Sequence, residues 1–240
     1  MGIGLLAGCR VANLPLGQEL HGYQGDALMK LFGICSLFLL AFGVAGYAVF
    51  VYGFLPLGSV VHPDMKASFL THNVGIYAHI FASAVAICLG PFQFLASIRR
   101  RFVRLHRWMG RVYLGIGVLV GGLAGLYMAT FAFGGIVSKL GFAMLAVLWL
   151  YTGLRAFLAI RRGDVIEHRR WMVRNFSLTL AAVTLRILLP ASQIAGMPFA
   201  VAYPAIAWLC WVPNLLVAER FFNRTQENAF VHPPRIRGRA

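Results

Sequence analysis

Two short motifs in the sequence place histidine, arginine, tryptophan and methionine in the same order, 62 residues apart. They are His106-Arg107-Trp108-Met109 and His168-Arg169-Arg170-Trp171-Met172. Neutral imidazole is a common metal ligand, and a haem iron can be held between histidines of two facing helices. His106 and His168 are therefore candidate metal ligands of a haem b, since the sequence has no Cys-x-x-Cys-His motif for covalent attachment. The alternative is that both motifs anchor helix ends at a membrane surface, where tryptophan is enriched.

Three further polar side chains stand in otherwise apolar sequence and complete the set of candidate cofactor-binding residues. Arg186 lies 18 residues after His168, which is about 27 Å along a helix, and we expect it at the same depth as His79. Such an arginine could hold a quinone carbonyl or a propionate beside His79, or it could extend its charged end to the membrane surface. Asn214 follows Pro213, which should kink its helix and free a backbone carbonyl, and the amide must find a hydrogen bond.

Other residues suggest packing or support more than chemistry. Gly117, Gly121 and Gly125 recur every four residues, which lets a helix or a flat cofactor approach closely. Gln93 is a polar group near the expected depth of the histidine pair, in the segment Gly90-Pro91-Phe92-Gln93-Phe94, which is expected to break the second span near its cytoplasmic end. Glu219 could pair with an arginine or orient a metal-bound histidine. The sequence contains no phosphate loop, dinucleotide fingerprint or nucleophile elbow, so no catalytic residue is assigned.

These residues must be positioned by membrane-spanning helices. The chain has 240 residues, of which 60% are hydrophobic and only 12% are charged, whereas soluble domains carry about 25% charged residues. An apolar segment of about 20 residues can span a bilayer as a helix, and six are present. They lie near 31–56, 69–98, 106–131, 136–160, 170–190 and 197–219. Open sheets are excluded in lipid and the segments are too long for barrel strands, so we expect an all-α bundle of six transmembrane helices.

The domain organisation follows from the same pattern. Residues 31–222 form the six-helix membrane domain, and residues 223–240 form a basic cytoplasmic tail. Residues 1–30 are an N-terminal extension, and Met29-Lys30 would be a plausible alternative translation start.

The positive charge is distributed to one side of this predicted bundle. The net charge is +15, and 19 of the 22 basic residues lie on one side, with Lys66, Lys139 and Arg186 as the exceptions. The positive-inside rule then predicts a multi-pass membrane protein with both termini in the cytoplasm. This distribution excludes a nucleic-acid-binding patch and favours anionic lipid headgroups as partners. Because the loops between the spans are small, a partner in a larger membrane complex is the other candidate.

A family resemblance is carried by residues spread over the bundle. They are His79, Gly90-Pro91-Phe92-Gln93-Phe94, Leu105-His106-Arg107, Gly110-Arg111-Val112-Tyr113, Gly141-Phe142, Trp149, His168-Arg169-Arg170-Trp171-Met172, Thr184-Leu185-Arg186, Trp211-Val212-Pro213-Asn214-Leu215 and Glu219. Over about residues 70–220 the chain resembles a family of bacterial multi-pass membrane proteins known as domain of unknown function 2306. At the level of the fold it is similar to the helical-bundle b-type cytochromes.

The histidine pair and the His79–Arg186 end together favour a b-type-cytochrome-like redox protein that binds haem b and exchanges with a quinone. The lack of catalytic signatures favours instead a non-enzymatic accessory subunit of a membrane complex or a small-molecule transporter. Both readings remain open at the level of the sequence.

Overall fold

The computed structural model describes residues 16–223, and these residues form helices without any β-strand. Contacts divide the chain into a unit that ends at Leu37 and a unit from Phe38 onward. The described part of the first unit, residues 16–37, is the beginning of helix α1. The elements are α1 (Leu16–Phe54), α2 (Pro63–Thr71), α3 (Asn73–Phe94), α4 (Ala96–Arg101), α5 (Val103–Val112), the π-helix η1 (Tyr113–Val120), α6 (Gly121–Ala129), α7 (Gly135–Arg161), α8 (Val165–Thr179), α9 (Ala181–Ile194), α10 (Phe199–Leu209), α11 (Val212–Val217) and the π-helix η2 (Ala218–Asn223).

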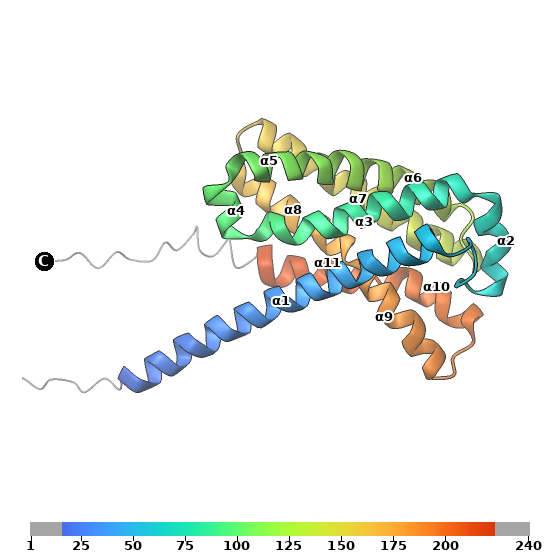
Figure 1. Ribbon diagram of the computed structural model, residues 1–240, viewed down its shortest axis with the longest axis horizontal. Helices are drawn as coiled ribbons and strands as arrows, with labels where there is room; N and C mark the ends of the chain where they lie inside the picture. The colour runs from blue at the N-terminus through green and yellow to red at the C-terminus, as the bar shows by residue number, and fades with distance from the viewer. Residues whose placement is uncertain (1–15, 224–240) are drawn as a thin grey trace, which may run out of the picture. The chain divides into compact units, whose positions relative to one another are not determined.

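Six helices among the described residues are long and apolar enough to cross a membrane, as the sequence predicts. They are Leu31–Phe54, Asn73–Phe94, Val103–Ala129, Gly135–Arg161, Val165–Ile194 and Phe199–Arg220. Figure 1 shows the last four spans built from α5–η1–α6, α7, α8–α9 and α10–α11–η2. Of the predicted basic tail, all but Asn223 lies outside the described residues.

The second span is shorter than predicted at both ends. His72, with φ −109° and ψ 35°, separates α2 from α3, so α3 starts after it. At the other end the expected break in Gly90-Pro91-Phe92-Gln93-Phe94 falls at the last residue of this segment, because α3 continues through Pro91 and ends at Phe94. Because Pro91 has no N–H to donate to the carbonyl of Ile87, one helical hydrogen bond is missing about one turn before α3 ends. Gly90 has a packing role instead, since a Cβ there would lie 2.1 Å from the ring of Phe176 on α8.

The repeated glycines of the third span pack it closely against α3. A Cβ on Gly117 would lie 2.7 Å from the Cβ of Ala86, and one on Gly125 would lie 2.8 Å from Nδ1 of His79. A Cβ on Gly121 would lie 3.1 Å from Oγ of Ser83. The expected close approach of a neighbouring helix is therefore confirmed.

A buried polar cluster joins the third, fourth and fifth spans. The Tyr113 hydroxyl lies 2.8 Å from Oδ1 of Asn175 and 2.9 Å from Oγ1 of Thr179. Nε1 of Trp149 donates to Oγ1 of Thr179 at 2.9 Å. Nδ2 of Asn175 donates to the carbonyl of Trp149 at 2.7 Å and to Oγ1 of Thr152 at 2.9 Å. The polar side chains of this cluster thus satisfy one another's hydrogen-bonding groups inside the bundle, as buried polar groups in a membrane must.

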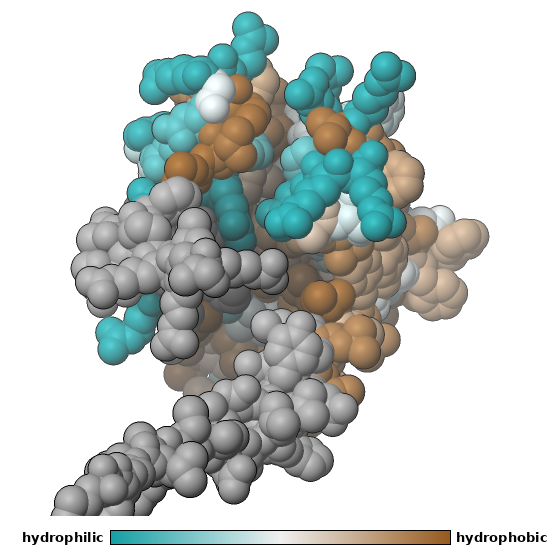
Figure 2. Space-filling view, turned by 90° about the vertical axis from the view of Figure 1, so that its left-hand side faces the viewer, coloured by the Kyte–Doolittle hydropathy of each residue, from teal (hydrophilic) through white to brown (hydrophobic). Residues whose placement is uncertain are grey.

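The arginines gather at one end of the second unit. This arginine-rich end is formed by α4, the start of α5 and the junction of α7 with α8, and its basic residues include Arg99, Arg100, Arg101, Arg161 and Arg170. Figure 2, which faces this end, shows hydrophilic side chains standing above an apolar flank. The opposite end carries α2 and the links from α6 to α7 and from α9 to α10. The bundle is thus polar at the arginine-rich end and apolar along its sides.

Candidate functional site

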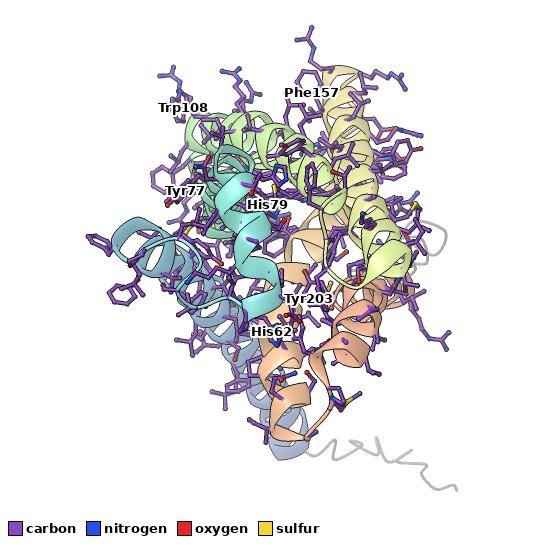
Figure 3. The ribbon with its side chains drawn as sticks, turned by 90° about the vertical axis from the view of Figure 1, so that its right-hand side faces the viewer. His62, Tyr77, His79, Trp108, Phe157 and Tyr203 are labelled. Carbon is purple, nitrogen blue, oxygen red and sulfur yellow. The ribbon has the colours of Figure 1, made fainter. Side chains whose placement is uncertain are left out.

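An apolar cavity lies inside the bundle, toward the end that carries α2. Its volume is about 460 Å³, a size typical of small-molecule sites. Its wall draws on α3, α6, α7, α9 and α10 and on α1 residues between Val44 and Tyr52. In Figure 3, which looks onto this end, His79 on α3 and Tyr203 on α10 lie toward the middle of the bundle, whereas Trp108 and Phe157 lie at its edge. This cavity unites residues from every one of the six spans.

His79 lines this cavity and has a defined tautomer. Its Nδ1 lies 2.8 Å from the carbonyl oxygen of Gly121, at the point where η1 ends and α6 begins. A carbonyl can only accept, so Nδ1 carries the hydrogen and the neutral ring keeps an acceptor at Nε2. Gly125 gives the ring its room, since a Cβ there would collide with it. The third span therefore both orients the imidazole and makes space for it.

Arg186 lines the same cavity from α9. One terminal nitrogen donates to the carbonyl of Ala182 at 3.1 Å, and the guanidinium lies 5.4 Å from the ring centre of Tyr47. Its Nε is buried and has no hydrogen-bond partner among residues 16–223. His79 and Arg186 both line one cavity, which agrees with the expectation that they lie in the same half of the bundle. The pair offers a ligand an acceptor at His79 and a positive charge at Arg186.

The rest of the wall is mainly apolar and aromatic, with a polar floor. Thr179 and Trp149 belong to the buried polar cluster and also line the cavity. Near α2 the wall contains Asp64, whose carboxylate lies 3.5 Å from Nδ1 of His62. His62 stacks on Phe199 with 3.9 Å between ring centres, which ties α2 to α10. The cavity is therefore apolar in its body and polar at a few fixed points.

His168 lies outside this wall, near the arginine-rich end. Its Nδ1 lies 2.9 Å from the carbonyl of Ala156 on α7, so in the neutral ring Nδ1 carries the hydrogen and Nε2 keeps a free lone pair. Metal-bound histidines commonly have this outer hydrogen bond. His106 differs, because its Nδ1 is buried and lacks a partner among the described residues. Nε2 of His168 could therefore hold a metal ion, and His106 could do so in the same way once its Nδ1 has an acceptor.

The buried polar cluster fixes the register of the two histidines. Tyr113 and Asn175 each lie seven residues, or two helical turns, after a motif histidine, and their side chains are hydrogen-bonded. His106 therefore shares a helix face with Tyr113, as His168 does with Asn175. Among the described residues no group of three or more histidine, cysteine or acidic side chains could hold a metal ion, so the pair stands alone.

Asn214 and His72 lie elsewhere. Asn214 donates from Nδ2 to Oγ1 of Thr184 and to the carbonyl of Cys210, both at 3.0 Å. It joins the fifth and sixth spans and satisfies the carbonyl freed where α10 ends before Pro213. Nδ1 of His72 lies 2.9 Å from the hydroxyl of Tyr127, and its ring stacks on Phe131. Neither residue is part of the cavity wall.

Glu219 makes an ion pair with Arg174 through two hydrogen bonds, Nε to Oε1 and NH2 to Oε2. This contact agrees with the expectation that Glu219 pairs with an arginine.

The sequence did not predict the buried polar cluster of Tyr113, Asn175, Thr179 and Trp149. A signal was present, because Tyr113 and Asn175 repeat the 62-residue spacing of the two motifs.

Comparison with known proteins places the chain in a family. No curated protein and no solved structure matches it. The family described as predicted membrane protein (DUF2306) matches residues 76–222, a range that contains His79, His106, His168, Arg186 and Asn214. The match covers five of the six spans completely or nearly so. The chain belongs to the DUF2306 family of predicted membrane proteins.

Proposed function

We propose that this protein is a membrane redox protein that binds a quinone-class ring in the cavity lined by His79 and Arg186. The observation that carries the proposal is the presence of these two polar groups in one largely apolar cavity of about 460 Å³. A quinone ring is flat and apolar with a carbonyl at each end. Arg186 can donate to a carbonyl, and Nε2 of His79 can accept from the hydroxyl of the reduced ring. The cavity thus suits both the oxidised and the reduced ligand.

The test is a titration of the purified protein in nanodiscs with a short-chain ubiquinone, followed by the fluorescence of Trp149, which lines the cavity. Removing one hydrogen bond to the ligand should weaken binding about tenfold, so H79L and R186M should each raise the Kd by about that factor. H72L is the matched control, since His72 is not part of the wall. An unchanged Kd in both cavity variants would contradict the proposal.

The second part of the proposal is a haem b between His106 and His168. It is supported by the register that Tyr113 and Asn175 give the two helices and by the Nδ1 bond of His168 to Ala156. His168 could hold the iron through Nε2, and His106 could do so once its Nδ1 donates to an added acceptor. When bound, haem would supply one-electron transfer. The two histidines would hold the iron, and the surrounding arginines would face the propionates.

Haem binding is tested by the absorption spectrum of protein purified after haem-replete expression. A Soret band that is lost in both H106A and H168A supports this part of the proposal. A band that survives in both variants would move the ligands elsewhere, and no band in the wild type would remove haem from the proposal. H72A should keep the band.

A different function is supported by the same cavity if no redox group is bound. The protein would then be an accessory subunit of a membrane complex or a carrier of an apolar small molecule. Binding of a quinone that shows no preference over a redox-inactive ring of the same size, in protein without a Soret band, would favour this second function. In either case we propose a bacterial inner-membrane location with the arginine-rich end in the cytoplasm, following the positive-inside rule.

A further inference from the structure

The place where α3 ends against α5 holds an unpaired buried amide. Gln93 is only 6% exposed, and its Nε2 is buried with no hydrogen-bond partner among residues 16–223. Its Oε1 lies 3.7 Å from the position that a Cβ on Gly110 would take. The amide therefore lies in the contact between α3 and α5, which we name the α3–α5 seam. Buried amide groups without a partner are costly, and native proteins rarely keep them.

His106 adds a second unpaired group to this seam. It lies one helical turn before Gly110, on the same side of α5. Its Nδ1 is also buried without a partner in the described part of the chain. Two neighbouring side chains thus each have a nitrogen that an acceptor atom would satisfy. An acceptor between them would complete the hydrogen bonds that the protein alone leaves unmade.

Arg99 supplies the charge that such an acceptor needs. It lies on α4, which connects α3 to α5, and it is half-buried whereas Arg100 and Arg101 are exposed. Within residues 16–223 it makes no ion pair with a carboxylate. Burial and the nearby charges of Arg169 and Arg100 lower the pKa of Arg99. A bound anion would relieve this like-charge repulsion.

The depth of the seam points to the source of the anion. Trp108, two residues after His106, is 66% exposed, and Val103 and Leu105 are exposed as well. Exposed tryptophan and basic residues on one short helix are typical of the headgroup level of a membrane. From Gln93, His106 and Arg99 we infer that the α3–α5 seam binds the phosphate of an anionic lipid headgroup. The phosphate accepts from Nε2 of Gln93, from Nδ1 of His106 and from the guanidinium of Arg99.

This inference is independent of the proposed redox function, although the two are compatible. Donation from Nδ1 of His106 to the phosphate leaves Nε2 free, which is the atom that a metal would take. The seam and the cavity draw on different residues. Lipid binding can therefore be measured without reference to haem or quinone.

The experiment compares the full chain in nanodiscs of phosphatidylcholine with nanodiscs that also contain phosphatidylglycerol. The wild type should show a higher Tm with phosphatidylglycerol, and native mass spectrometry should find a retained phosphatidylglycerol molecule. R99Q removes the positive charge that faces the phosphate and Q93L removes the amide donor, so each should weaken retention about tenfold and lose most of the rise in Tm. R101Q, which removes the same charge from an exposed position on the same helix, should keep both.

Q93L carries a second readout that separates binding from folding. Leucine removes the unpaired amide, so in phosphatidylcholine alone Q93L should be at least as stable as the wild type while losing the response to phosphatidylglycerol. Equal responses of Q93L, R99Q and wild type would overturn the inference. Inorganic phosphate added to phosphatidylcholine nanodiscs should have little effect. If it reproduces the full rise in Tm, the anion is free phosphate and the assignment to a lipid is wrong.

Discussion

Tyr113 makes the buried hydrogen bonds that join the third span to the fifth. It is fully buried, and its hydroxyl contacts both Oδ1 of Asn175 and Oγ1 of Thr179. Y113F keeps the ring and removes the donor, which leaves Oδ1 of Asn175 unpaired in a fully buried position. The expected loss is about 1–3 kcal/mol in the free energy of unfolding. Denaturation in detergent micelles, followed by circular dichroism, measures it.

Y77F is the control for this substitution. Tyr77 stacks on Phe81, and its hydroxyl makes no hydrogen bond within the described part of the chain, so its removal should change stability little. A loss for Y113F no larger than that for Y77F would mean that the Tyr113–Asn175 bond does not hold the spans together.

At this scale the sequence predicted the residues that break an apolar pattern singly. His79 and Arg186 could be placed at one depth by counting residues, and they do line one cavity. Tyr113, Thr152 and Thr179 were not predicted to form a cluster, because tyrosine and threonine are common in apolar helices and do not by themselves indicate a partner. Their importance comes from contacts between three spans, and spacing within one span does not encode these. The unpaired nitrogens of Gln93 and His106 could not be predicted either, because they too depend on contacts between spans.

Asn214 shows how a polar residue can be recognised while its partners are not predicted. It is expected among the cofactor-binding residues, and in the structure it joins the fifth and sixth spans through Thr184 and the Cys210 carbonyl. N214L should therefore lower stability by about 1–3 kcal/mol. It should leave the Kd for a short-chain ubiquinone unchanged, because Asn214 is not part of the cavity wall. A quinone titration of folded N214L that shows weaker binding would restore the residue to the site.

Helix packing is decided by positions that accept no side chain. In η1, a Cβ on Gly117 would lie 2.7 Å from the Cβ of Ala86, whereas one on Gly115 would meet nothing within 4 Å. G117A should therefore force α3 away and cost about 1–3 kcal/mol. G115A, two residues earlier in the same π-helix, should be neutral or stabilise by up to about 1 kcal/mol because alanine favours helix. Thermal unfolding of the two variants in the same nanodiscs measures the difference.

If G117A is as stable as G115A, Gly117 is not required for the close approach of the third span to α3.

The sequence predicted this close approach from the four-residue repeat of glycines, and it also predicted the number and rough limits of the spans. It did not predict the π-helices, the break at His72 or the continuation of α3 through Pro91. Those features depend on local hydrogen bonds, which composition and periodicity do not report.

The whole molecule is organised by the separation of charge from the apolar body. Arginines gather at the end formed by α4, the start of α5 and the α7–α8 junction, while the cavity lies toward the end that carries α2. If the positive-inside rule holds, the arginine-rich end faces the cytoplasm and the cavity lies in the outer half of the membrane. A ligand would then reach His79 and Arg186 from the lipid or from the outer surface.

Cysteine labelling in intact cells tests this orientation. The four native cysteines are replaced by serine, and single cysteines are introduced at exposed positions of the two ends: S59C and A195C near α2 and the α9–α10 link, R101C and R162C at the arginine-rich end. A membrane-impermeant maleimide should label the first two in intact cells and the other two only after permeabilisation. Labelling of R101C and R162C in intact cells, with S59C and A195C protected, would reverse the orientation and put the cavity in the cytoplasmic half. Because the same charge rule supports both anionic lipid at the seam and outward access to the cavity, that reversal would also place the seam against the outer leaflet.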